Sequence, residues 1–202
     1  KVLTPLLEQE DEKLKGLSAQ FATPANPLAD LKVAFQMQPV VSRRAALDEI
    51  YQFLDASRQS YQPDVFIPYK TMLQDKLAAV LVAVDVQGVE SEVLVTYVVD
   101  ALNRMGLGVV DASAPDKVLE VQIQTDVDEY DSQKVAGLIW CSSGAAISLV
   151  DATRGVTFAR FNVHERAGTT RAADSLRKSM QSVGEQAAQQ ISNRLEIYLK
   201  TK

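Results

Sequence analysis

Three consecutive stretches in the second half of the chain alternate between apolar and polar residues with a period of two. In the first, VLEVQIQTDVDEYD, we expect Leu119, Val121 and Ile123 to face one side while the residues between them face the other. The stretches AGLIWCSSGAAISLVD and VTFARFNVHE follow it. A period of two is typical of a strand with one buried and one wet face. Three such strands in succession predict an antiparallel sheet that needs a cover on one face only.

A break from Asp151 to Gly155 separates the second stretch from the third. Aspartate favours local turn hydrogen bonds and glycine tolerates a positive φ, so the break predicts a hairpin turn. We expect Asp151, Thr153 and Arg154 only to shape this turn. The apolar residues beside it are expected to pack on the core: Val150, Phe158 and Phe161.

A strand, a helix and a short strand are predicted ahead of the sheet. The run AAVLVAVDV is almost continuously apolar and β-branched, which is typical of a central strand covered on both faces. Gly88 ends it, Ser91 can cap a helix, and Gly106 can close that helix in the left-handed conformation before LGVVDA returns as a strand. The predicted buried stripe of the helix consists of Val93, Tyr97, Ala101 and Met105.

A long amphipathic helix is predicted from Thr170 onward, because apolar residues recur there at intervals of three or four. They are Ala173, Leu176, Met180, Val183, Ala187, Ile191, Leu195 and Leu199. We therefore predict a four-stranded core sheet covered on one face by the helices that start near Ser91 and Thr170. The fold class is α+β, with a mixed, mainly antiparallel sheet, a β-α-β-β-β-α core and an N-terminal α/β extension.

The first part of the chain is divided by composition. Residues 1–30 are charged and then proline-containing, which predicts a short helix and a linker. Residues 31–77 are expected to form an α/β segment and residues 78–202 the main domain. Within 31–77 we first predict a strand, LKVAFQMQP. A helix, SRRAALDEIYQFLDASRQSY, should follow, capped by Ser42 and with Leu47, Ile50, Leu54 and Tyr61 on one face. The segment QPDVFIPYK is then expected to be extended and to lie at a sheet edge.

Composition excludes several classes of function. The formal net charge of −5 argues against nucleic acid, whose binding needs clustered Lys and Arg. A single cysteine, Cys141, excludes an intramolecular disulfide and a cysteine-based metal site. No apolar run approaches the roughly twenty residues of a membrane span. Because Lys1 stands where a methionine would begin a gene product, we expect a preceding segment that carried a targeting signal.

The residues that could carry chemistry are better explained by structure. The acidic group Asp126, Asp128, Glu129 and Asp131 has the oxygen ligands for a hard cation. A calcium loop beginning at Asp126 would need a glycine and a glutamate where Asp131 and Gly137 stand, so we expect a solvated strand end.

A nucleophile is not indicated either. Ser142 or Ser143 could pair with His164, but CSSGAA lacks the glycine-flanked serine elbow of hydrolases. Cys141 lies in an apolar strand beside Trp140, where a buried thiol is usually inert. The glycines of Gly106–Gly108 follow a helix, so the helix dipole has the wrong sign for a phosphate. We therefore assign no catalytic, cofactor-binding or metal-binding residue and expect no enzyme.

Residues from about Ala79 to Leu199 resemble the small α/β domains of bacterial envelope lipoproteins. These include the curli secretion channel lipoprotein, the penicillin-binding-protein activator lipoproteins, the N-terminal domain of TolB and the flagellar T protein. The likeness is carried by AAVLVAVDV as the opening strand, VLEVQIQTDV as a later strand and ISLVDATRGVTFARFNV as the hairpin, followed by the alanine-rich helix RAADSLRKSMQSVGEQAAQQI. Residues before this region have no counterpart in the family.

The resemblance implies a non-catalytic interaction or assembly module in the periplasm or at the outer membrane. Its partners would be envelope proteins or copies of itself, with no cofactor and no nucleic acid, and it would meet the membrane only through a lipid anchor on a preceding segment. A second hypothesis is an enzyme or small-ligand binder with a cleft near Asp85, Gln87 and Asp111, at the carboxyl end of the central strands. That hypothesis requires a deep pocket whose titratable groups have shifted pKa values.

Overall fold

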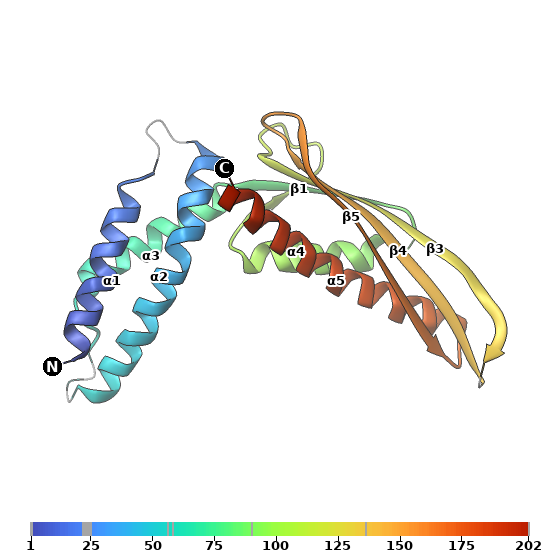
Figure 1. The fold of residues 1–202 in the computed structure, drawn as a ribbon, viewed down its shortest axis with the longest axis horizontal. Coiled ribbons are helices and arrows are strands. Elements are labelled where there is room, and N and C mark those ends of the chain that lie inside the picture. The colour runs from blue at the N-terminus through green and yellow to red at the C-terminus, as the bar shows by residue number, and fades with distance from the viewer. Residues whose placement is uncertain are drawn as a thin grey trace. The chain divides into compact units, whose positions relative to one another are not determined.

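A computed structural model describes residues 2–21, 26–55, 57, 59–89, 91–135 and 137–201, with the side chains of all of these except residues 91, 128–135, 200 and 201. The chain divides into two compact units, Lys1–Val80 and Leu81–Lys202. The first contains helices only, and the second contains the sheet and two further helices (Figure 1).

The helical unit consists of α1 (Leu3–Ser18), α2 (Pro27–Leu54) and α3 (Pro63–Ala78). Each helix contacts the other two. The apolar core between them is formed by Leu7, Leu14, Leu31, Ala34, Met37, Phe66, Leu73 and Leu77. A buried arginine, Arg44, links the helices: its Nε donates to Asp11 Oδ1 at 2.8 Å and its Nη2 donates to the Tyr61 carbonyl at 2.6 Å.

The predicted strand over residues 31–39 is wrong, because these residues belong to α2. Helix α2 begins earlier, where Asn26 Oδ1 accepts from the Ala29 amide at 3.3 Å, and it continues through Pro39. Ser42 therefore lies inside the helix and is not its cap. The reason is burial at helical spacing, with Val33, Met37, Val40 and Arg44 all on the inner face.

The predicted extended segment QPDVFIPYK is also wrong. Pro63 opens α3 in its first turn, where a missing amide donor costs nothing. Phe66 and Leu73 then recur at helical spacing and are buried. In the described residues the N-terminal extension is therefore helical and not α/β.

The second unit runs β1 (Leu81–Gln87), α4 (Ser91–Arg104), β2 (Gly108–Val110), β3 (Leu119–Val135), β4 (Leu138–Asp151), β5 (Val156–Thr169) and α5 (Ala172–Thr201). The strand order is β2-β1-β3-β4-β5. β1 pairs in parallel with β2 and β3, while β3, β4 and β5 pair antiparallel. The α+β class and the mixed, mainly antiparallel sheet are confirmed, and β2 adds a fifth strand at the edge of the predicted four.

Helices α4 and α5 pack on one face of this sheet (Figure 1). Leu119, Val121 and Ile123 of β3 face them and are buried, as the alternation predicts. The predicted stripe of α5 is confirmed from Met180 to Leu199, whereas Ala173 is exposed and Ser175 and Ser179 take the inner positions of the first turns. On the opposite face Gln122, Gln124, Asn162 and His164 are exposed.

The buried face of α4 differs from the prediction by about one residue. Its buried residues are Leu94, Val98 and Leu102, whereas the residues of the predicted stripe are half-buried. Gly106 has a φ of 83° and ends the helical segment, with its amide bonded to the Asn103 carbonyl. The closing role expected of this glycine is therefore confirmed.

Candidate interaction surface

The serines considered as nucleophiles do not form a catalytic pair with His164. Ser143 is buried on the helix-covered face of the sheet and shares a hydrogen bond of 2.6 Å with Ser179 of α5. His164 is exposed on the opposite face, over Gly144. Ser142 shares that face, but no hydrogen bond joins it to His164 in the part of the chain that the structure describes. Cys141 is buried beside Ser143, with 4.0 Å between Sγ and Oγ.

The two aspartates of the proposed cleft lie near the same end of the sheet, because Ala83 of β1 pairs with Val110 of β2. Each carboxylate is bound by a neighbour two residues away. Asp85 accepts from Gln87 Nε2 at 3.2 Å, and Asp111 accepts from the Ser113 hydroxyl at 2.6 Å and its amide at 2.9 Å. These bonds from Ser113 lower the pKa of Asp111, which is opposite to the rise that a carboxylic general acid needs.

The acidic group on β3 is only partly described. Asp126 is exposed, while the side chains of Asp128, Glu129 and Asp131 lie outside the described residues. Among the side chains that are described, no cluster of His, Cys, Asp or Glu could hold a metal ion. Nor does any helix in the described ranges have the length and apolar character needed to cross a membrane.

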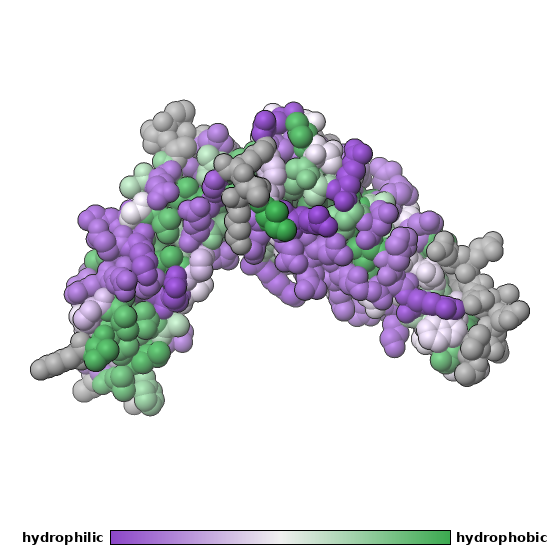
Figure 2. Space-filling model, in the orientation of Figure 1, coloured by the Kyte–Doolittle hydropathy of each residue, from purple (hydrophilic) through white to green (hydrophobic). Residues whose placement is uncertain are grey.

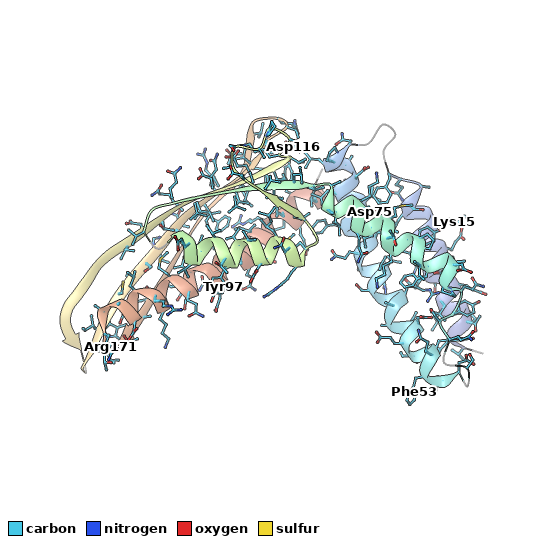
Figure 3. All side chains as sticks on the ribbon, turned by 180° about the vertical axis from the view of Figure 1, so that it is seen from behind. Lys15, Phe53, Asp75, Tyr97, Asp116 and Arg171 are labelled. Atoms are coloured by element: carbon cyan, nitrogen blue, oxygen red, sulfur yellow. The ribbon has the colours of Figure 1, made fainter. Side chains whose placement is uncertain are left out.

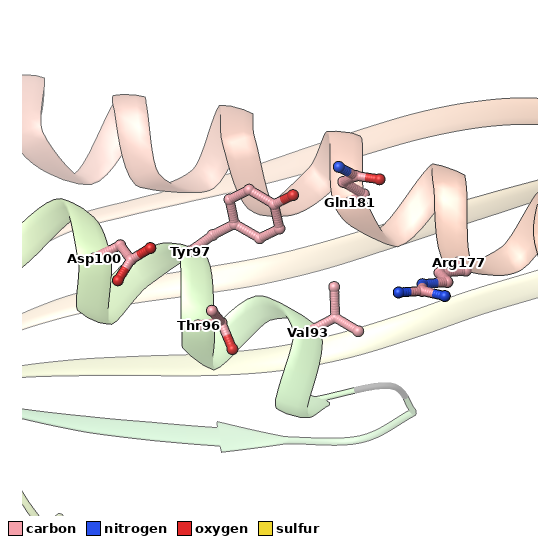
Figure 4. A pocket seen from close by; sticks show the side chains of 6 residues that line it. All are labelled: Val93, Thr96, Tyr97, Asp100, Arg177 and Gln181. Atoms are coloured by element: carbon pink, nitrogen blue, oxygen red, sulfur yellow. The ribbon is translucent and has the colours of Figure 1, made fainter.

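A pocket of about 370 Å³ lies between α4 and α5 (Figure 4). Its lining consists of Val93, Thr96, Tyr97 and Asp100 from α4 and Arg177 and Gln181 from α5. The Tyr97 ring lies against Gly184, where an added Cβ would come within 2.7 Å of it. Val93 and Tyr97 belong to the stripe that the sequence predicted to be buried. In the structure they line this pocket instead.

The outer edge of β5 is a poor surface for adding another strand. Glu165 carries a charge on the helix-covered side and accepts a hydrogen bond from Gln186 of α5. The register of the β4–β5 ladder also shifts between the pairs Leu149–Ala159 and Val150–Thr157, so that β5 carries one additional residue there. Inward-pointing charges and bulges are the features by which natural proteins prevent edge pairing.

Among the residues that the structure describes, most of the large apolar side chains that are exposed lie at one end of the helical unit, where α1 begins, α2 ends and α3 begins. We call this group the apolar end. It consists of Val2, Leu6, Ile50, Phe53, Leu54, Val65 and Ile67. Phe53 is 86% exposed, Val2 79% and Leu54 67%. Figure 2 shows an apolar area at the end of the unit that carries the N-terminus, and Figure 3 shows Phe53 at the end of α2.

Hydrogen bonds bring these three helix ends together. Tyr61, in the connection between α2 and α3, donates to Glu8 Oε1 of α1 at 2.9 Å. Its amide also donates to Asp48 Oδ1 of α2 at 2.7 Å. Burial by itself raises the pKa of Asp48. Hydrogen bonds from Ser60, Tyr61 and Gln52 outweigh this effect and leave the pKa below its usual value, so the carboxylate stays charged. Hydrogen bonds of Tyr61 therefore connect the three helices next to the apolar end.

The sequence analysis did not predict this surface, because Ile50 and Leu54 recur at the spacing of a buried stripe. The structure buries a different face of α2, formed by Val40, Arg44 and Asp48. The only available signal was the pairing of two adjacent large apolar residues, Phe53 and Leu54, at the point where the helix gives way to polar residues.

No family model matches the chain, and no curated protein matches it by sequence. Several solved structures align with it. A protein of Caulobacter crescentus named as a lipoprotein is 14% identical, with a TM-score of 0.44, over 63% of this chain and 95% of its own. A minor lipoprotein of Acinetobacter baumannii is 10% identical, with a TM-score of 0.40, over 58% and 93%. The rare lipoprotein B of Shewanella oneidensis is 15% identical, with a TM-score of 0.37, over 60% and 95%.

Proposed function

We propose that the chain is a non-catalytic interaction or assembly module of the bacterial cell envelope, located in the periplasm or at the outer membrane. The observation that carries the interaction part is the apolar end of the helical unit. Burying one Leu, Ile, Val or Phe side chain contributes about 1.5–3 kcal/mol, and this end leaves several of them in water. Exposed apolar patches of this kind mark interaction sites.

The arrangement of the reactive side chains supports the non-catalytic part. Ser143 and His164 lie on opposite faces of the sheet, and Asp85 and Asp111 are each bound to a near neighbour. An active site brings a nucleophile, a base and an orienting group within hydrogen-bond reach of one another. None of the candidate groups considered above is arranged in this way among the described residues.

The envelope location depends on the resemblance of residues 79–199 to envelope lipoprotein domains. The resemblance implies a module in the periplasm or at the outer membrane that would meet the membrane only through a lipid anchor. The proposed partners are envelope proteins or copies of the chain itself.

Two experiments test this proposal. The complete gene, expressed in its own bacterium, should give a product that fractionates with the outer membrane or periplasm and incorporates labelled palmitate. In the same cells, cross-linking of the intact protein should give a defined adduct that weakens strongly when Phe53 is replaced by Ser. A matched control is Ile197→Ser, which removes an exposed apolar side chain from α5. A cytoplasmic product, or adducts indifferent to Phe53, would contradict the proposal.

A further inference from the structure

The described charges around the apolar end are mainly acidic. Within residues 2–9, 49–55, 57 and 59–70, the charged side chains that the structure describes are Glu8, Glu49, Asp55, Asp64 and Lys70. Lys1 and Arg58, the other basic residues of the same segments, lie outside the described residues. When these two are counted with Lys70, the segments hold four acidic and three basic residues and so remain acidic by one charge.

The acidic side chains and the apolar ones occupy the same turns of helix. Glu49 is exposed and lies one turn before Phe53 on α2, and Asp64 is exposed in the first turn of α3 beside Val65. An apolar centre with charges at its rim is the usual organisation of a protein interface. Rim charges select the partner and speed its association, because potentials of opposite sign attract across the contact.

We infer that the apolar end binds a segment of another protein that combines apolar side chains with Lys or Arg, such as a basic amphipathic helix. This inference rests on the proposed interaction function and specifies its partner. The apolar face of such a segment covers Phe53, Leu54 and Ile50, while its basic residues lie against Glu49 and Asp64.

Two other occupants fit the charges less well. A second copy docked through the same surface would place identical acidic rims against each other, since a twofold interface pairs a patch with itself. An anionic membrane surface attracts basic segments and repels an acidic rim. A basic partner is the occupant for which both the apolar centre and the rim are favourable.

The test uses the intact chain and two labelled amphipathic peptides with the same leucine face, one with lysine and one with glutamate on the polar face. Fluorescence anisotropy should show the lysine peptide binding at least about tenfold more tightly than the glutamate peptide. Phe53→Ser should weaken lysine-peptide binding by about tenfold or more, and Glu49→Lys should reduce the preference for lysine. Ile197→Ser and Glu185→Lys, both on exposed positions of α5, should leave binding unchanged and serve as matched controls.

Each alternative gives a distinct result. Equal binding of both peptides overturns the basic partner. If the protein sediments with phosphatidylcholine vesicles and Phe53→Ser does not, the surface binds lipid. If the protein forms a concentration-dependent dimer and Phe53→Ser does not, the surface binds a second copy. Either result overturns the inference. If cross-linking in cells still depends on Phe53 in these cases, only the partner chemistry fails. If neither assay depends on Phe53, the interaction function fails as well. Circular dichroism confirms that the variants are folded.

Discussion

Gly155 is the residue on which the turn between β4 and β5 most depends. Its φ is 63°, in the left-handed region, and an added Cβ would meet no atom within 4 Å. Gly155→Val should therefore lower the free energy of unfolding by roughly 1 kcal/mol or more through backbone strain alone. Arg154→Ala, at an exposed position, should change it by less than about 0.5 kcal/mol. Urea denaturation measures both, and a midpoint unchanged in Gly155→Val would contradict the strain.

Asp151 does more than shape this turn, contrary to our expectation from the sequence. Its carboxylate is buried and accepts from Thr153 Oγ1 at 2.6 Å, the Arg154 amide at 3.1 Å and Tyr198 Oη of α5 at 2.9 Å. Local spacing revealed the turn bonds, but Tyr198 lies 47 residues away and no sequence pattern indicated the contact. The side chain ties the hairpin to the terminal helix.

The acid stability of the protein should depend on Asp151. Burial by itself raises the pKa of Asp151, but the bonds from Thr153, Tyr198 and Arg154 outweigh this effect and leave the pKa below its usual value. The stabilisation is therefore complete above the ordinary carboxyl pKa of about 4 and is lost as the pH falls through the lower folded value. Unfolding free energies measured from neutral to acidic pH should fall less steeply in Asp151→Asn. Parallel curves for the two proteins would refute this assignment.

At the scale of elements, α5 is held to β5 by an aromatic stack. The ring centroids of Phe158 and Tyr198 lie 4.0 Å apart, with an interplanar angle of 18°. Tyr198→Phe should keep the stack and lose only the bond to Asp151, at about 1–2 kcal/mol. Tyr198→Ala should lose both and cost about 3–5 kcal/mol. Thermal and chemical denaturation give the two values, and equal losses would show that the ring contributes nothing.

The success of sequence-based prediction differed between elements for physical reasons. The strands from Leu119 onward alternate over many residues, and a one-residue error would expose their whole apolar face, so the pattern was decisive. The segment LKVAFQMQP alternates too, but its residues also fit a helical face, and the deciding signal was the distant cap at Asn26. Short apolar runs fit both periods, and tertiary burial decides between them. The apolar end was missed for a different reason, because Ile50 and Leu54 recur at helical spacing and were therefore assigned to the buried face of their helix.

At the scale of the whole molecule, the two units differ in how many of their large apolar side chains are exposed. In the unit Leu81–Lys202 the sheet and helices bury their apolar faces against each other, and the large exposed apolar residues are the isolated Val89, Val156 and Ile197. The other seven in the described chain form the apolar end of the helical unit. The unit Leu81–Lys202 therefore buries most of its large apolar side chains by itself, whereas the helical unit leaves apolar side chains exposed, as the proposed interaction requires.

A fragment of residues 81–202 should consequently fold by itself. It contains all five strands, α4 and α5, and with them the core residues Val82, Leu94, Ile147, Met180 and Ile191. At about 120 residues, a chain buries roughly two thirds of its unfolded surface, which suffices for a cooperative domain. The fragment should show mixed helix and strand circular dichroism and a single cooperative melt. Tyr198→Ala should lower the stability of the fragment and of this unit in the intact chain by similar amounts, whereas Phe53→Ser in the intact chain should not affect it. A fragment without a cooperative transition would show that the sheet depends on the helical unit, and would place the domain boundary elsewhere than between residues 77 and 81.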